Sequence, residues 1–478
     1  MKDIQLGKLL TSLVILLCLF LTLSKVTSLE LRLWDEGRNA VNALEMAQEG
    51  FSIVTTYDWN PEHWNTKPPL LIWIQALFFK IFGLTIFAVR LPSILAALAF
   101  IPIIISLGKR WEFGRIFSLS SIVVLFTIPL FLFVHTFRTG DYDGLLTLLM
   151  FSYSLFYLFF LEYEKKKSLW LFFLFLFLAI MTKGIAGLLF LPGLFLLTID
   201  WKKLKFILTS RDVYLGITTV VVGVFLYYFV RNLMDPEYWE NVVLNELGGR
   251  FLDSADKHYQ PRGFYFWYLR EIGMRWYYYA FPFFAFMAFL GSRTRKYAIF
   301  CLLIILSHLA IMTISQTKVY WYILPIIPFV ALIFGLGYST LFMFLQQRMK
   351  SWNVIHFCCF LLLAFPIYKK IQSVSNTRNL LEEQKDYYIS RFLIENMEDR
   401  NILENTNIMV AGHITSVRFY VEQYEKKGGI IYIRHISQIK PGDKVLISDE
   451  QLKKDLGAKF ELELLENEYG ATLYRVLN

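Results

Sequence analysis

Charged residues at the end of the first long apolar segment are of types that could carry out chemistry. Asp35 and Glu36 are adjacent, and Arg38 follows them closely. A carboxylate can act as a general base on an attacking hydroxyl, and a cation can stabilise the charge of a leaving phosphate. Beside a membrane segment, these residues are typical of an enzyme that acts on a lipid phosphate ester.

Asp35 is predicted to begin a helix that Gly50 ends. Helical spacing brings three polar residues onto the face of Asp35, namely Arg38, Asn39 and Asn42. Another face is apolar and could rest on the membrane, namely Trp34, Val41 and Leu44. Alternatively, Asp35 is only the N-cap of this helix and pairs with Arg38. Glu36 is expected to be a solvated acid of the first turn.

Three lysines lie where lysine is unexpected. Lys67 precedes a pair of prolines, and Lys183 and Lys318 lie in short turns that are predicted to face outside. Basic residues normally collect in cytoplasmic loops, so lysines in outer turns suggest an anionic ligand. Alternatively, Lys67 is a membrane-surface anchor, or the two turns face the other side.

Two further groups of polar residues lie in predicted outer loops. Asp141 and Asp143 are at the outer end of an apolar segment, where carboxylates are costly and usually functional. Asp141 could instead pair with Arg138. His258 and Arg262 lie in a long loop, and a single histidine is more often a surface hydrogen-bonding residue than a metal ligand.

The composition indicates an all-α polytopic membrane protein. The 478 residues are 56% hydrophobic, and the mean hydropathy is +0.46. Many apolar segments approach the ~18 residues that mark a membrane span. The net charge of +9 comes mostly from short loops between apolar segments, so it indicates topology and no nucleic-acid partner.

We expect about eleven spans, an inside N-terminus and a large first outer loop, because the basic loops alternate in this way. The expected spans are roughly 8–24, 85–107, 116–134, 143–161, 168–182, 185–199, 213–231, 276–291, 298–314, 319–345 and 353–368. Residues 69–82 are too short to cross and are expected to form an interfacial or re-entrant helix. Residues 1–370 would then form the membrane domain, and residues 371–478 a small α/β domain outside, with β-rich runs near 407, 430, 444 and 471.

In this order, several motifs resemble the GT-C class of lipid-linked-sugar transferases, which includes the lipid A aminoarabinose transferase and the dolichyl-phosphate-mannose protein mannosyltransferases. The resemblance covers roughly residues 8–345. The motifs are Trp34-Asp-Glu-Gly-Arg, Lys67-Pro-Pro-Leu, Phe82-Gly, Arg90-Leu-Pro-Ser, Asp143 with Gly-Leu-Leu-Thr-Leu, Met181-Thr-Lys-Gly, Arg250-Phe with His258 and Pro261, and Ser315-Gln-Thr-Lys with Tyr322-Ile-Leu-Pro.

The resemblance implies roles for individual residues. Asp35 and Asp143 match the two catalytic acids, and cations match positions that meet the donor phosphate: Arg38, Lys67 and Lys183. Lys318 and Arg262 are further candidates to bind that phosphate. His258 matches a histidine that helps to hold a divalent metal, although Thr66 stands where the family has an acid.

The implied activity is inverting transfer of a sugar from a polyprenyl-phosphate carrier to a lipid A, glycan or protein acceptor. It would take place on the outer side of the cytoplasmic membrane, among membrane lipids, and could serve lipid A modification or protein mannosylation. A transporter or flippase, or a non-catalytic binder of lipid-linked sugars, could use the same cations. Transporters often carry internal repeats and broken helices, and the sequence shows neither.

The substitution Asp35→Asn separates the two interpretations of Asp35. Asparagine caps a helix about as well as aspartate does, so a pure cap would tolerate the change. A general base would not, because an amide cannot accept a proton at neutral pH. We expect transfer to fall by at least ~10² while the protein stays folded, as measured by sugar transfer with purified protein. Glu36→Gln serves as the control and should have a mild effect. A rate above about a tenth of wild type would show that Asp35 is not the base.

Overall fold

A computed structural model describes residues 2–32, 34–248, 260–348, 364–374, 387–412 and 414–477. The chain divides into two compact units. The first comprises residues 1–24, 61–71 and 90–374, and the second comprises residues 25–60, 72–89 and 375–478. The first is helical, and the second joins residues 25–60 and 72–89 to the C-terminal sheet. The predicted division into domains at residue 370 stays a prediction.

Among the described residues, six helices are long and apolar enough to cross a membrane. They are α4 (Ile86–Arg110), α6 (Tyr142–Tyr163), α7 (Lys166–Lys183) with η1 (Gly184–Leu188), α10 (Arg211–Met234), α14 (Arg295–Ile314), and η5 (Tyr320–Ile326) with α15 (Ile327–Arg348). Shorter apolar helical segments are residues 7–23 of α1 (Lys2–Leu23), α3 (Leu70–Phe82), α5 (Gly114–Thr127) and α13 (Trp276–Leu290). These ten helices match nine predicted spans and the predicted short helix after Pro69.

Two predicted spans differ from the structure for local reasons. The segment predicted as 116–134 is helical only to Thr127, since Pro129 disfavours helical backbone at Ile128, whose ψ is 125°. The segment predicted as 185–199 forms only η1 and the six-residue α8 (Leu191–Leu196). Gly187 turns the chain back onto α7, where a Cβ would lie 2.7 Å from the Ala179 backbone. The predicted span 353–368 lies mostly outside the described residues, and the count of eleven stays a prediction.

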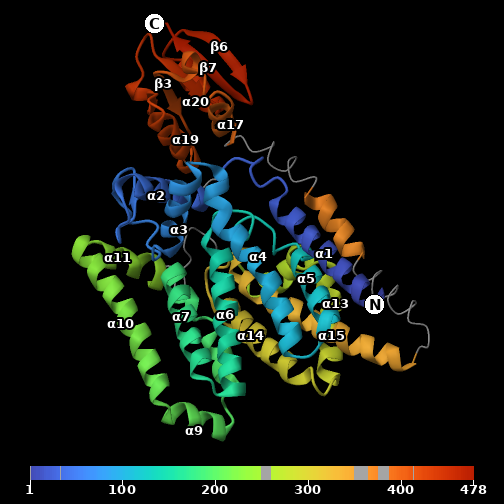
Figure 1. The fold of residues 1–478 in the computed structure, drawn as a ribbon. Helices are drawn as coiled ribbons and strands as arrows, with labels where there is room; N and C mark the ends of the chain where they lie inside the picture. The colour runs from blue at the N-terminus through green and yellow to red at the C-terminus, as the bar shows by residue number, and fades with distance from the viewer. Residues whose placement is uncertain are drawn as a thin grey trace. The chain divides into compact units, whose positions relative to one another are not determined.

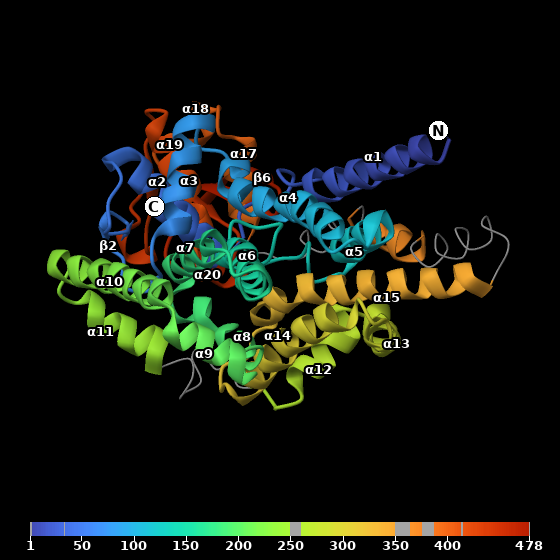
Figure 2. The same ribbon diagram turned by 60° about the horizontal axis from the view of Figure 1, so that its bottom comes forward.

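Close backbone contacts hold part of the helical unit together. The helices α13, α14 and α15 lie side by side, and α15 also packs against α5 (Figures 1 and 2). A Cβ at Gly337 of α15 would lie 2.5 Å from the Phe284 carbonyl oxygen of α13. Small residues of this kind allow helices to approach in lipid, where the hydrophobic effect does not drive their association. Further described helical elements of this unit are α9 (Trp201–Thr209), α11 (Tyr238–Val242), η2 (Val243–Gly248), α12 (Phe264–Tyr268) and η4 (Leu269–Gly273), and residues 364–374 are also helical.

The C-terminal part of the second unit is the predicted small α/β domain. Its strands are β3 (Thr406–Met409), β4 (Ile431–Ile433), β5 (Lys444–Ile447), β6 (Leu462–Glu468) and β7 (Ala471–Val476), in the order β4-β3-β5-β7-β6. Strand β3 pairs in parallel with β4 and β5, and β7 pairs antiparallel with β5 and β6. Its helices are α17 (Tyr388–Glu395), α18 (Arg400–Leu403), α19 (Thr415–Lys426) and α20 (Glu450–Gly457).

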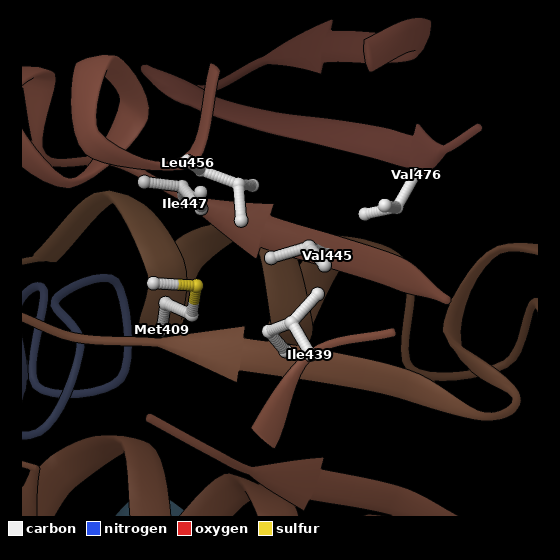
Figure 3. Close-up of a cluster of buried hydrophobic side chains, with 6 residues drawn as sticks. All are labelled: Met409, Ile439, Val445, Ile447, Leu456 and Val476. Carbon is white, nitrogen blue, oxygen red and sulfur yellow. The ribbon is translucent and has the colours of Figure 1, made fainter. Parts of the chain in front are cut away.

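Apolar side chains on one face of this sheet form its core (Figure 3). Val445 and Ile447 are two residues apart on β5, so both point to this face, where Leu456 of α20 joins them. Four of the strands correspond to predicted β-rich runs, and β6 was not predicted. Its glutamates Glu463, Glu466 and Glu468 are poor strand formers, but β6 is an edge strand, where charges are common.

The helix predicted from Asp35 is α2 (Asp35–Glu49), which ends at Gly50 with a φ of 114°. Its N-cap is Trp34, so the interpretation of Asp35 as N-cap is wrong. Glu36 is also not solvated, since it is fully buried and accepts a hydrogen bond of 2.8 Å from the Arg32 N–H. Val41 and Leu44 do not face lipid, because both are fully buried within this unit, where α19 packs against α2.

Two buried carboxylates face each other between α2 and α19. Glu45 accepts a hydrogen bond of 3.2 Å from the Trp59 N–H, whereas neither carboxylate oxygen of Glu422 has a partner among the described residues. Burial, and then the charge of Glu45, raise the pKa of Glu422 to about 8. The positive charge of Arg418 opposes the shift, and Glu425 and Asp58 add to it.

Because the folded-state pKa of Glu422 lies above its unfolded value, the folded state binds more protons. Stability should therefore fall as the pH rises from the unfolded pKa of ~4.3 toward 8. We expect Glu422→Gln to reduce this dependence and to raise the free energy of unfolding at pH 9 by on the order of 1–3 kcal/mol. Thermal unfolding of the full-length protein between pH 5 and 9 measures this effect. Glu395→Gln, at an exposed acid of α17, is the control, and an equal response of both variants would contradict the interpretation.

Candidate functional site

A small cavity in the helical unit contains two of the predicted site residues. Asp143 lies in the first turn of α6, and Lys183 is the last residue of α7. The Lys183 ammonium donates to both carboxylate oxygens of Asp143 at 2.7 Å, and the two side chains are only 6% and 7% exposed. The cavity of about 50 Å³ therefore has a buried ion pair in its wall.

Helix ends bring this pair together. Helices α6 and α7 are joined by a tight turn after Tyr163, so the start of α6 lies beside the end of α7. The dipole of α6 favours an anion at its first turn, and that of α7 favours a cation at its last. Gly184 ends α7 with a φ of 54°, a conformation in which glycine has no steric penalty.

Polar groups from other elements complete the cavity wall, namely Glu246, His308, Ser315 and Tyr322. The Lys183 ammonium lies 5.1 Å from the centre of the Tyr322 ring. Glu246 links the cavity to Lys67, whose ammonium is 3.9 Å from a Glu246 oxygen and 3.2 Å from the Asn65 side-chain oxygen. Sequence reasoning missed Glu246, because a single acid in a long loop gives no signal.

A hydrogen-bonded network fixes the segment that carries Lys67. The Tyr238 hydroxyl of α11 donates to the Thr66 carbonyl at 2.8 Å. The His63 ring lies 3.0 Å from both carboxylate oxygens of Asp235, which also accepts from Arg231 at 2.6 Å. Burial raises the pKa of Asp235, but the hydrogen bonds from His63 and Arg231 outweigh it, and the net shift is downward.

The other predicted residues lie in different surroundings. The Lys318 ammonium donates to the Ser315 carbonyl at 2.5 Å, and burial followed by the charge of Arg262 lowers the pKa of Lys318. Lys318 thus donates to a residue of the cavity wall without lining the cavity itself. The side chain of Arg262 is exposed. Asp141 accepts from the Thr139 hydroxyl at 2.5 Å and lies 3.4 Å from the His135 ring. The alternative that Asp141 pairs with Arg138 is wrong, because Arg138 donates to the Leu21 and Ser24 carbonyls.

Asp35 and Arg38 belong to the second unit. Within it, the Arg38 guanidinium lies over the ring of Tyr57, at 4.2 Å from the ring centre. A guanidinium over a tyrosine ring is stabilised by a cation–π interaction. The roles of Asp35 as base and Arg38 as phosphate ligand stay predictions.

An apolar groove of about 770 Å³ lies in the helical unit. Its walls come from α7, η1, α10 and α11, and α10 lies alongside α7 in Figure 1. Phe173, Leu176, Val220, Val221 and Phe225 are among its lining residues. Ile185 lines both the groove and the Asp143–Lys183 cavity, so the two spaces are neighbours.

Known proteins resemble this chain in sequence and in structure. Residues 66–229 match the family model for dolichyl-phosphate-mannose-protein mannosyltransferases. An uncharacterized protein of Aquifex aeolicus is 31% identical over 233 residues, and the chain spans about half the length (51%) of this curated relative. Crystal structures of ArnT from Cupriavidus metallidurans, one apo and one bound to undecaprenyl phosphate, match at TM-scores of 0.70 and 0.69. Their sequence identities are 14% and 15%, over 99% of this chain and 98% of ArnT.

The chain has an ArnT-like fold. The predicted resemblance to the GT-C class is thereby confirmed. With its apolar helices, this ArnT-like chain is a multi-pass membrane protein. The orientation of its ends stays a prediction.

The described residues of the Asp143–Lys183 cavity do not fit a divalent metal. Both Asp143 oxygens accept hydrogen bonds from Lys183, so a metal cation would have to displace that ammonium, and the positive charge of Lys67 lies 3.9 Å from Glu246. At position 66, a buried threonine hydroxyl takes the place of the acid. His258 lies outside the described residues, and its metal role stays a prediction. No step below passes through a metal.

Removing Lys183 should have two separable effects. Lys183→Ala leaves Asp143 buried without its cation, which should lower the free energy of unfolding by about 3–5 kcal/mol. The second change Asp143→Asn should restore most of that stability. Donor affinity should stay low in the double variant, because the cation itself is missing. Thermal unfolding and the KM for a polyprenyl-phosphate sugar measure the two effects.

Lys67→Ala is the matched comparison. Its partner Glu246 is 16% exposed, so we expect a smaller loss of stability with a similar loss of donor affinity. If the double variant regains wild-type donor affinity, Lys183 has only a structural role.

Proposed function

We propose that this chain is a GT-C-type glycosyltransferase that takes its sugar from a polyprenyl-phosphate donor. One observation carries the proposal, namely that an apolar groove and a cavity with buried charges share a wall at Ile185. A polyprenyl-phosphate sugar has the same division, with a long apolar chain joined to an anionic phosphate.

The groove suits the polyprenyl chain. Its walls are aliphatic and aromatic side chains of α7 and α10, and each buried methylene group contributes about 0.8 kcal/mol to binding. The phosphate would then lie at the end of the groove beside Lys183. Lys67 would be close to it, because Lys67 pairs with Glu246 of the cavity wall. The crystal structure of ArnT bound to undecaprenyl phosphate supports a lipid of this class.

The proposed reaction is a direct displacement. An acceptor hydroxyl oxygen forms a bond to the anomeric carbon, the bond from that carbon to the phosphate oxygen breaks, and the anomeric configuration inverts. Asp35 would take the hydroxyl proton, and the polyprenyl phosphate would leave with the electron pair. Preorganised cations stabilise the charge that grows on this leaving group.

Asp143 is predicted from the sequence to be the second catalytic acid, but its geometry favours a different role. Both of its oxygens accept from Lys183, so we propose that it positions this lysine toward the phosphate. An orienting carboxylate that is fixed on a helix end keeps the ammonium in place before the substrate binds.

The acceptor and the side of the membrane belong to the proposal. The acceptor would be a hydroxyl group of a lipid, glycan or protein on the outer side of the cytoplasmic membrane. The same groove would also suit a flippase or a non-catalytic binder of lipid-linked sugars. Only the enzyme releases free polyprenyl phosphate, so that product separates the three functions.

Two neighbouring valines of α10 test the groove. Val221 lines it, whereas Val222 is not among the lining residues of the described chain, and both are largely exposed. Val221→Trp should fill part of the groove and displace at least two methylene groups, which raises the donor KM by about tenfold. Val222→Trp, the matched control, should leave the KM unchanged.

The assay measures free polyprenyl phosphate at increasing donor concentration, with donors of long and short chain. The long-chain donor should lose more affinity than the short one in Val221→Trp. Equal KM values for both variants would contradict the placement of the lipid chain. A wild-type protein that releases no polyprenyl phosphate would contradict the enzymatic function itself.

A further inference from the structure

A second group of cations in the helical unit lies apart from the Asp143–Lys183 cavity. It consists of Arg138, Arg275 and Lys370, none of which lines that cavity. Burial, and then the charges of Arg138 and Arg275, lower the pKa of Lys370 to about 7. Burial, and then the charge of Arg90, lower the pKa of Arg138 to about 10. Several like charges have therefore been brought together against their mutual repulsion.

Backbone carbonyls accept hydrogen bonds from two of these side chains. Arg138 donates to the carbonyls of Leu21 and Ser24, at 3.1 and 2.6 Å, at the end of α1. Lys370, only 5% exposed, donates at 3.4 and 3.3 Å to the carbonyls of Pro129 and Leu132, just beyond α5. Cations commonly cap helix C-termini in this way. Capping explains these four hydrogen bonds, and the two side chains together have eight N–H donors.

Arg275 has no such explanation. It directly precedes α13, has a φ of 51°, and its side chain is exposed and makes no hydrogen bond or ion pair within the described residues. The positive charge of Arg275 interacts with Tyr268. The buried hydroxyl of Tyr268 also has no hydrogen-bond partner among the described residues. No carboxylate of the described chain forms an ion pair with Arg138, Arg275 or Lys370. The group therefore offers donors and positive charge without an internal counter-ion.

We propose that Arg138, Arg275 and Lys370 form a second anion-binding site, which takes the phosphate group of an anionic membrane lipid. The ends of α1 and α5 and the start of α13 meet at this group, and the ends of apolar helices lie at the level of lipid headgroups. Arginine matches phosphate oxygens with two parallel hydrogen bonds. A bound anion also restores the positive charge of Lys370. This inference does not depend on the proposed reaction.

The test uses the purified full-length protein in micelles that contain phosphatidylcholine, phosphatidylglycerol or both, with bound lipid counted by native mass spectrometry. Wild type should prefer the anionic phosphatidylglycerol. Arg275→Gln should lower that affinity by about tenfold, the loss expected for a charge-assisted hydrogen bond. Because Arg275 is exposed, the variant should fold. Arg270→Gln is the matched control, since Arg270 is exposed on η4 and pairs with Glu271 at 2.6 Å.

Competition with inorganic phosphate identifies the source of the anion. Retention of phosphatidylglycerol in the presence of phosphate supports a lipid headgroup, and its displacement assigns the site to free phosphate instead. Lys370→Met provides a second measurement and should lower the affinity as Arg275→Gln does. Equal phosphatidylglycerol affinity in wild type, Arg275→Gln and Lys370→Met would overturn the proposal.

Discussion

The candidate site depends on one buried ion pair, between Asp143 at the start of α6 and Lys183 at the end of α7. Two charges in a low-dielectric interior are tolerated only when they satisfy each other, so each fixes the position of its partner. The pair also fixes the position of α6 along α7, since a shift of either helix by one turn would separate the charges by about 5.4 Å. The cavity wall is thus set by electrostatics as much as by packing.

Around this pair, a cavity with charged groups in its wall lies next to an apolar groove. The groove between α7 and α10 offers almost no polar atoms, whereas the cavity beyond Ile185 contains carboxylates, a lysine and a tyrosine ring. Lys67 reaches this region because the network of His63, Asp235 and Arg231 holds its segment to α10. The helix that forms one wall of the groove therefore also positions a candidate phosphate ligand.

Local patterns in the sequence predicted much of the fold. Apolar length predicted the membrane helices, and Gly50 predicted the end of α2, because these signals depend on residues close in sequence. The same patterns failed where a local break was overlooked, as at Pro129 in α5 and at Gly187 after α7. They also failed for Glu36, Val41 and Leu44, whose burial is provided by segments distant in the sequence, such as α19.

The sequence by itself determined the class of the protein and the candidate residues. Membrane segments, carboxylates beside them and lysines in unexpected turns can be recognised from residue type and spacing alone. Only the tertiary structure decided which of these residues meet. In the structure, Lys183 pairs with Asp143, Lys67 pairs with Glu246, and Lys318 donates a hydrogen bond to the Ser315 carbonyl. Those pairings join residues from separate helices and loops, and no local preference specifies such contacts, because they arise only when the whole chain packs.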